Sequence, residues 1–421
     1  MNCLNQRNLF HSLYIVKDQT EEILKRNFSE ILIVIIISTA ILAGIVFTSD
    51  LLVKSNVLYY GKWMHFDYIK TVQTFPDINL TAPYCWRLFA PFLVYLLPFT
   101  IQTGFLIITF SSIIISAVLM YLIAKHLFDN LYYPWISLLA YFSFIYVVRV
   151  NVIEFISVDS LAFLFVLLSI FAIYKKNKAL FVVSTILGIL TKEILFIVFP
   201  LYFSINYTSK QSRKYYLHLI YETFILSLPA MFAYLLLRII VVPNGSYNYL
   251  DMLVNATKYR VDSVLGLFST LNKSLFAKQN NFENSLINIY RISFGAIGPT
   301  LFFIILKARK NRNIVLRLSP LIVLSFLQIF IAGDNERLVA VGFPAYILLF
   351  LYAVHSFVHE NKIDIKYFFI FSLIDVCIQF FLTKNYYWQT YYTVVFQLVL
   401  GLIMLAIIYL IKDRKLHRSS T

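Results

Sequence analysis

The chain contains little charge for its length. Only 14% of its 421 residues are Asp, Glu, Lys or Arg, whereas 60% are hydrophobic, and the mean hydropathy is +0.76. Soluble globular domains average about 25% charged and about 45–50% apolar residues, so an ordinary soluble domain is excluded. The 36 basic residues outnumber the 21 acidic ones. In so apolar a chain this excess indicates membrane orientation and not affinity for nucleic acid.

Cysteine, glycine and proline are also scarce. The three cysteines, Cys3, Cys85 and Cys377, are odd in number and far apart, which excludes a disulfide framework and a cysteine metal cluster. Eleven glycines and eleven prolines are too few for a fibrous or low-complexity chain. The apolar runs are continuous and too long for the alternating strands of a β-barrel. The sequence therefore predicts an all-α, polytopic transmembrane helix bundle.

The apolar runs predict about twelve membrane spans. Residues 1–30 form an expected cytoplasmic N-terminal segment without the features of a signal peptide, and residues 412–421 an expected cytoplasmic tail. Two long external connections are expected at about 50–100 and 243–292. The spans lie near 31–48, 102–124, 131–150, 159–174, 178–191, 193–206, 217–242, 293–306, 314–332, 338–356, 367–384 and 392–411.

The short connections between these spans differ in charge on the two sides of the membrane. Because basic residues concentrate on the cytoplasmic side, we expect both termini in the cytoplasm of a multi-pass cell-membrane protein, the inner membrane in a prokaryote. The short external connections then hold only Arg149, Lys192, Arg337 and Lys384. The cytoplasmic ones hold Lys125, Lys175, Lys176, Lys178, Lys210, Arg213, Lys214, Lys307, Arg309, Lys310, Arg312, Lys362 and Lys366.

Each long external connection contains a candidate helix. Residues 87–98 (RLFAPFLVYLLP) are apolar but too short to span a membrane and contain two prolines. This pattern predicts a helix that lies in the outer interface or dips partly into the membrane. The second connection is polar and predicts one or two amphipathic helices.

Several ionisable residues fall on the predicted outer side, beside or within apolar runs. A charge in hydrocarbon is costly and usually has a partner or a wet cavity. Arginine and lysine suit a lipid-linked phosphate held at membrane depth, and a carboxylate can accept a proton from an attacking hydroxyl. The residues are Asp67, Arg87, Arg149, Glu154, Asp159, Lys192, Glu193, Asp334, Glu336 and Arg337.

The order of these features resembles the GT-C class of polytopic glycosyltransferases, whose donors are polyprenyl-phosphate sugars. The resemblance rests on Asp67 in a long first external loop, followed by the PYxWRxxxPFL-like segment 83–93. It continues with Asp159 in SVDSLAFLF, the GxLTKE segment 188–193, and a GDNER turn that precedes Phe343 and Pro344.

The resemblance implies the roles of two aspartates, and the chemistry of phosphate binding suggests those of the other residues. Asp67 would be the catalytic base, with Asp159 as supporting acid. The residues expected to bind substrate or phosphate are Arg87, Arg149, Lys192, Glu193 and Arg337. The partners would be a lipid-linked sugar donor, a glycan or glycolipid acceptor and membrane lipids. No soluble nucleotide cofactor is expected, because the chain has no glycine-rich phosphate loop, and a need for a divalent metal stays open.

The residues themselves leave other interpretations open. A polysaccharide polymerase or ligase of lipid-linked oligosaccharides would use a similar external set of cations, and a glycolipid transporter or flippase is a non-enzymatic alternative. Asp67 also fits a solvated loop residue, and Arg87 an interface anchor. Arg238 and Asp375, both in apolar runs, suggest a structural pair. His355 and His359 share a helix face that we expect to be solvated.

Overall fold

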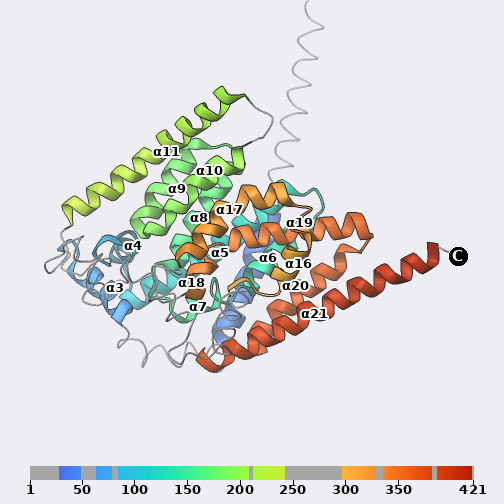
Figure 1. Ribbon diagram of the computed structural model, residues 1–421. Coiled ribbons are helices and arrows are strands. Elements are labelled where there is room, and N and C mark those ends of the chain that lie inside the picture. The colour runs from blue at the N-terminus through green and yellow to red at the C-terminus, as the bar shows by residue number, and fades with distance from the viewer. Residues whose placement is uncertain are drawn as a thin grey trace, which may run out of the picture.

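The computed structural model of the protein describes residues 28–48, 63–77, 84–207, 212–241, 296–328, 335–381 and 386–419. Within these ranges the regular elements are helices and there is no strand (Figure 1), which confirms the all-α prediction. The external connection predicted at 243–292 lies outside the described residues, as do residues 1–27 of the predicted N-terminal segment and Asp334.

The chain begins, within the described part, with a helix at Phe28–Thr48. The elements that follow are α3 (Trp63–Thr74), the 3₁₀ helix η1 (Tyr84–Trp86), α4 (Phe89–Leu96), α5 (Ile101–Leu127), α6 (Tyr132–Ser143), α7 (Arg149–Ile153), α8 (Asp159–Tyr174), α9 (Lys178–Thr191), the 3₁₀ helix η2 (Glu193–Ile197), α10 (Val198–Asn206), α11 (Arg213–Ile240), α16 (Thr300–Lys307), α17 (Arg312–Leu327), α18 (Asn335–Ala340), α19 (Phe343–Asn361), α20 (Ile365–Phe381) and α21 (Tyr386–Ser419).

Every apolar run predicted from the sequence overlaps a described helix. Among the described residues, three helices are long and apolar enough to cross a membrane: Phe28–Thr48, α5 and α11. Several others, including α8, α9 and α10, are apolar but shorter. The total of about twelve spans remains a prediction.

The turn between α8 and α9 has the bounds that the sequence predicts, and its local chemistry explains them. Lys176 takes a left-handed φ of 53° that ends the first helix. Asn177 then caps the second helix, since its side chain accepts a hydrogen bond from the backbone N–H of Leu180 at 3.0 Å.

The apolar run at 131–150 is not one helix, which corrects the sequence-based interpretation. α6 ends at Ser143, and the helical path resumes only at Arg149 as the short α7. Polar groups support the irregular backbone around α7: Asn151 donates to the carbonyl of Val147 at 2.7 Å, and Thr109 of α5 donates to the carbonyl of Phe155 at 2.9 Å. Hydropathy cannot reveal this break, because the residues at the break are themselves apolar.

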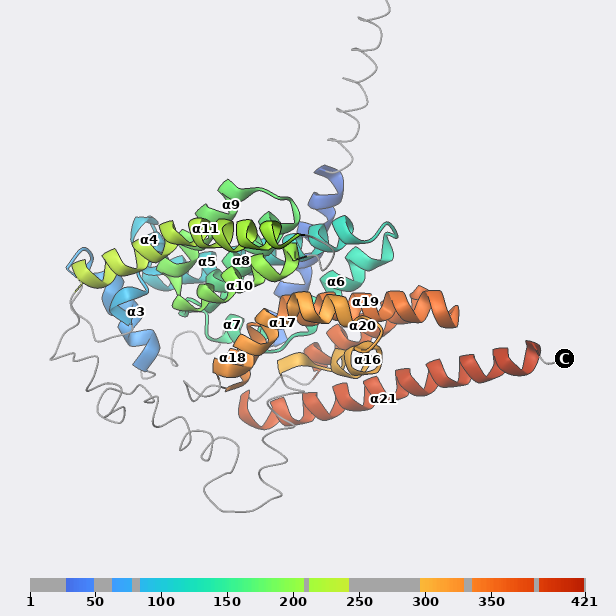
Figure 2. The same cartoon turned by 45° about the horizontal axis from the view of Figure 1, so that its top comes forward.

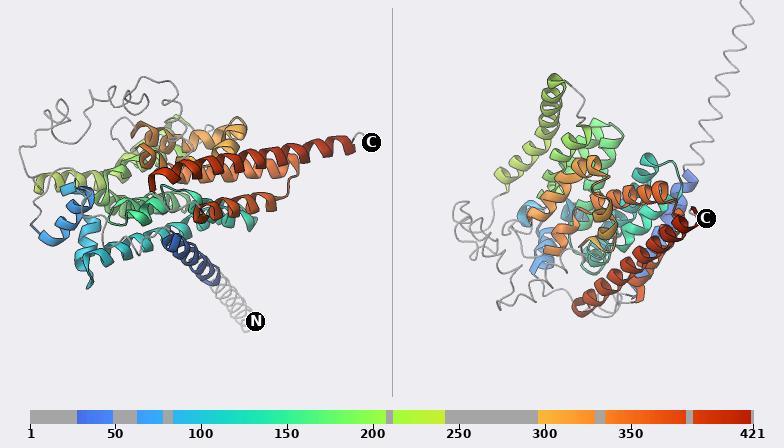
Figure 3. Two further views of the ribbon diagram at one scale, coloured as in Figure 1. Left: turned by 90° about the horizontal axis from the view of Figure 1, so that it is seen from below. Right: turned by 45° about the vertical axis from the view of Figure 1, so that its right-hand side comes forward.

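Helix α8 lies in the core and is buried almost all round, as expected of a helix that is apolar on every face. It packs against α5 and α9. Helix α11 lies along the outside of α9 and α10, and α21 runs beside α20 at another edge (Figures 1 and 2). Figure 3 shows α21 and the Phe28–Thr48 helix as separate rods at the periphery. The outward side chains of α11 are apolar, for example Phe232 and Ile239.

Helices α3 and α4 form a small unit at one end of the bundle. The ring of Phe75 lies 5.6 Å from that of Phe92 and 5.0 Å from that of Tyr95. α4 also packs closely on α5, where a Cβ added to Gly104 would lie 2.8 Å from Cγ1 of Val94. The short helix predicted within residues 87–98 is therefore present, and its position relative to a membrane stays a prediction.

Candidate functional site

Four charged side chains from four separate elements form one cluster. Asp159 begins α8 and Lys192 follows α9; the Nζ of Lys192 lies 2.5 Å from Oδ1 of Asp159. Arg337 of α18 donates through Nη1 to Oε2 of Glu154 at 2.8 Å and through Nη2 to Oδ2 of Asp159. Both carboxylates are buried, Asp159 at 5% and Glu154 at 7% exposure. We call Glu154, Asp159, Lys192 and Arg337 the charged cluster.

A second ion pair adjoins the charged cluster. Arg87, which precedes α4, donates through Nε to Oε2 of Glu193 at 3.1 Å and through Nη2 to Oε1 at 2.6 Å. The guanidinium also lies beside the hydroxyl of Tyr68 on α3 and 5.8 Å from the ring centroid of Tyr84. Because Glu193 directly follows Lys192, the Arg87–Glu193 pair and the charged cluster form one continuous site.

The turn that carries Lys192 and Glu193 is unusually tight. Lys192 is extended, with φ −162°, and its N–H donates to the carbonyl of Gly188 at 2.8 Å. A Cβ added to Gly188 would lie 2.4 Å from Cγ of Leu195 and 3.0 Å from Cβ of Phe165. The segment that follows α9 folds back against α9 at Gly188, where there is no room for a side chain. This explains the glycine at the start of GxLTKE.

Charges of the two signs are balanced in this site. Three cations (Arg87, Lys192 and Arg337) face three carboxylates (Glu154, Asp159 and Glu193). Such pairing offsets the desolvation penalty that a buried single charge would carry. An arginine has five N–H donors and a lysine ammonium three, and such donors are the groups that bind the oxygens of a phosphate.

The protonation states of Tyr68 and Arg87 follow from burial and from their contacts. Burial raises the pKa of Tyr68 to about 12, although the neighbouring Arg87 acts in the opposite direction. Burial lowers the pKa of Arg87, but Glu193 and Tyr68 outweigh it, so the net pKa lies above the ordinary arginine value. At neutral pH the site therefore holds a neutral Tyr68 hydroxyl beside a charged guanidinium.

Asp67, the predicted base, lies on α3 directly before Tyr68. Its side chain is half-buried, and its carbonyl accepts a hydrogen bond from the Thr71 hydroxyl at 2.8 Å. The buried face of α3 contains His65, Tyr68 and Val72. Tyr68 is the residue of this helix that reaches Arg87, so α3 packs against the site. Asp67 precedes Tyr68 in the sequence.

Arg149 lies at the start of α7 and is 7% exposed. It precedes Glu154 of the charged cluster by five residues, on the irregular segment between α6 and α8. The Ser157 hydroxyl of this segment donates to the side-chain oxygen of Asn151 at 3.5 Å. The structure therefore places Arg149 on the segment that supplies two carboxylates to the cluster.

Sequence reasoning missed Tyr68 altogether and named Glu154 only among the outer charges. Tyr68 is one of 30 tyrosines, and only its position next to Asp67 distinguishes it. Glu154 could have been recognised from its spacing, because it lies in the same polar segment as Arg149 and Asp159.

Arg238 and Asp375 do not pair with each other, which corrects the expected structural pair. The guanidinium of Arg238 lies 3.7 Å from the ring centroid of Trp86 and 4.2 Å from that of Tyr234. Asp375 accepts a hydrogen bond from Gln397 at 2.9 Å in a different part of the bundle. A guanidinium over an aromatic ring is attracted by the electrons of the ring face.

The two histidines of α19 differ in their surroundings. His359 is exposed as predicted, but His355 is half-buried, and its Nδ1 lies 3.2 Å from the Tyr133 hydroxyl. The described residues contain no group of three or more His, Cys, Asp or Glu side chains that could hold a metal ion.

Comparisons with known proteins give no family for this chain. No protein-family model matches it, and no curated protein is significantly similar to it. The site geometry and the sequence must therefore carry any functional proposal.

Proposed function

We propose that this protein is a membrane glycosyltransferase that moves a sugar from a polyprenyl-phosphate donor to a lipid-linked or cell-surface glycan on the extracytoplasmic face. The proposal rests on the resemblance to the GT-C class and on the charges that gather at one end of the helix bundle.

One observation carries the proposal. Arg87, Lys192 and Arg337 lie up to 250 positions apart in the sequence. Their side chains nevertheless belong to two groups of ion pairs that adjoin at the consecutive residues Lys192 and Glu193. Burying these charges together costs free energy that apolar residues of similar size would avoid. Arginine and lysine side chains held together in this way suit the binding of a phosphate group, and this match supports the proposal.

The proposed roles come from the resemblance for the two aspartates and from phosphate chemistry for the cations. Asp67 accepts the proton of the acceptor hydroxyl as its oxygen attacks the anomeric carbon of the donor. The bond between that carbon and the phosphate oxygen breaks, and the electron pair leaves with the phosphate. The cations stabilise the departing phosphate. Asp159, which forms ion pairs with Lys192 and Arg337, orients the acceptor hydroxyl as the supporting acid.

Glycan analysis in cells tests this function. In a strain that lacks the gene, the wild-type chain and Asp77→Asn should restore the missing surface or lipid-linked glycan, whereas Asp67→Asn should not. Asp77 is exposed, follows α3 and undergoes the same change of charge, so it is a matched control. Full restoration by Asp67→Asn, at wild-type protein levels in the membrane, would disprove the role of Asp67 as base.

A further inference from the structure

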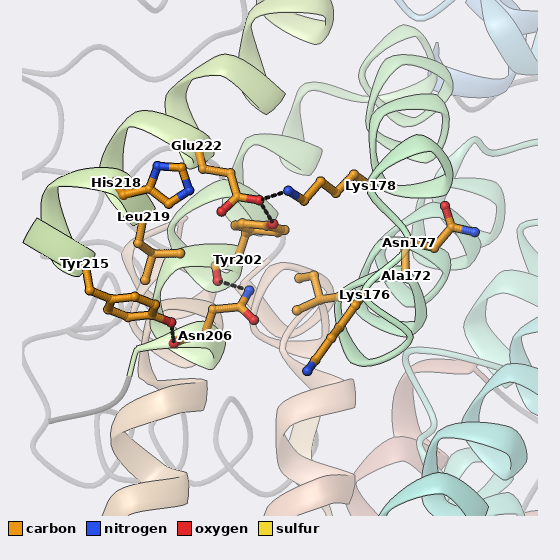
Figure 4. Close-up of a pocket in the computed structure, with 11 residues that line it drawn as sticks. Ala172, Lys176, Asn177, Lys178, Tyr202, Asn206, Tyr215, His218, Leu219 and Glu222 are labelled. Carbon is orange, nitrogen blue, oxygen red and sulfur yellow. Dashed lines mark hydrogen bonds and ion pairs between the residues drawn. The ribbon is translucent and has the colours of Figure 1, made fainter. Parts of the chain in front are cut away.

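A pocket of about 150 Å³ lies at the opposite end of α8 from the charged cluster. Its wall combines the turn between α8 and α9, the end of α10 and the first turns of α11 (Figure 4). Since α8 begins at Asp159 and its 16 residues span about 24 Å, the pocket is well separated from the charged site. The proposed glycosyl transfer does not use it.

Two lysines of the α8–α9 turn line this pocket, Lys176 and Lys178. The Nζ of Lys178 lies 2.6 Å from Oε1 of Glu222, which also accepts a hydrogen bond from the Tyr202 hydroxyl at 3.0 Å. Figure 4 shows these contacts on one side of the pocket, with Asn206 and Tyr215 on another. The carboxylate fixes the ammonium at the pocket wall and leaves it with further N–H donors.

The surroundings of the pocket are strongly cationic. Glu222 is the one carboxylate among the lining residues, against two lysines and His218. Lys175 precedes the first lysine in the sequence, and Arg213 and Lys214 begin α11, just before the lining residue Tyr215. The net charge of this region favours an anion as ligand.

Apolar surface begins directly beside the pocket. α11 is long enough to cross a membrane, and beyond the lining residues it exposes Ile225, Leu228 and Phe232. The orientation predicted from the basic connections puts this end of the bundle at the cytoplasmic surface. An anion bound here would therefore sit at the level of lipid headgroups with acyl chains beside α11.

We propose that this pocket binds the phosphate of an acidic phospholipid headgroup, with Lys176 and Lys178 as its charged ligands. The acyl chains would lie along the apolar face of α11. This proposal does not depend on the glycosyltransferase assignment, because it concerns the other end of the bundle and different residues.

Binding of a fluorescent phosphatidylglycerol to the purified full-length chain in neutral detergent tests the proposal. The double variant Lys176→Gln/Lys178→Gln should bind at least about tenfold more weakly than wild type, because each charge-assisted contact to phosphate is lost. Lys366→Gln, an exposed lysine at the start of α20, is the matched control and should bind as wild type does. Thermal unfolding of each variant checks that the fold is retained.

A second variant separates the pocket from a general attraction to positive charge. His218→Trp keeps both lysines but fills the space that His218 lines, so it should also lose binding. Unlabelled phosphatidylglycerol should compete with the probe, and phosphatidylcholine should not. Equal competition by inorganic phosphate would contradict a lipid ligand. Wild-type affinity in the double lysine variant, or in folded His218→Trp, would overturn the pocket as the binding site.

Discussion

Arg87 and Glu193 form a bidentate ion pair across 106 positions of the sequence. The pair joins the segment before α4 to the turn after α9, and Glu193 is adjacent to Lys192 of the charged cluster. The short α3–α4 unit, with Asp67, is thereby fastened to the end of the bundle that holds the other cations.

Substitution of both Arg87 and Glu193 should lower the free energy of unfolding by less than the sum of the losses in the two single variants. Arg87→Gln leaves the carboxylate of Glu193 without its guanidinium, and Glu193→Gln does the converse, whereas the double variant leaves neither charge. We expect a coupling free energy of about 1–3 kcal/mol between the two changes, measured by denaturant unfolding of the purified protein in detergent. A coupling near zero would mean that the pair contributes nothing to the attachment of α4.

Arg337 should be the most sensitive position of the charged cluster for stability. Arg337→Gln leaves Glu154 and Asp159 buried without their shared cation, which should cost about 3–5 kcal/mol. Arg312→Gln, an exposed arginine at the start of α17, should change the free energy of unfolding by less than about 0.5 kcal/mol. Equal effects of the two substitutions in the same unfolding measurement would show that burial of the Arg337 ion pairs is unimportant.

Gly188→Ala should disturb the turn that carries Lys192 and Glu193. The added methyl group meets Leu195 and Phe165, and overpacking of this kind costs about 1–3 kcal/mol. Leu195→Ala in the same chain removes the nearest clash, so the two changes together should cost less than the sum of each alone. Strict additivity in unfolding measurements would contradict the close approach of α9 and η2.

Tyr68→Phe should weaken the site without unfolding the protein. The hydroxyl beside Arg87 is lost, which costs about 1–3 kcal/mol if the buried guanidinium N–H finds no other acceptor. On the proposed function, sugar transfer should fall while the variant remains folded. Tyr95→Phe, on the half-exposed side of α4, is the control and should keep wild-type transfer. Unchanged transfer in Tyr68→Phe would remove this tyrosine from the site.

The sequence predicted the positions of the helices better than it predicted the breaks and connections between them. The bounds of α8 and α9 follow from apolar length and from the polar turn at Lys175–Asn177, which are local features. The break after Ser143 does not follow from local features, because the residues around it are apolar. It accompanies a tertiary contact, in which the segment after the break brings Glu154 and Asp159 to Arg337. Local patterns contain no information about such distant contacts.

The residues of the candidate site could be predicted from the sequence, but the contacts between them could not. The scarcity of charge is enough to single out Asp159, Lys192, Glu193 and Arg337, since each interrupts or borders an apolar run. Their pairing could not be predicted, because four elements contribute to it. Arg238 illustrates the limit: its guanidinium lies over the rings of Trp86 and Tyr234, whereas Asp375, the partner expected from the sequence, accepts a hydrogen bond from Gln397.

The most direct test of the glycosyltransferase proposal is sugar transfer by the purified full-length protein in lipid nanodiscs. A panel of radiolabelled polyprenyl-phosphate hexoses and pentoses would be offered with lipid-linked glycan acceptors from the native membrane. We predict that the wild-type chain and Asp77→Asn transfer label from one of these donors, and that Asp67→Asn loses at least about a hundredfold in rate, the share typical of a positioned general base. Transfer by Asp67→Asn at the wild-type rate, or no transfer from any donor by folded wild-type protein, would contradict the proposal.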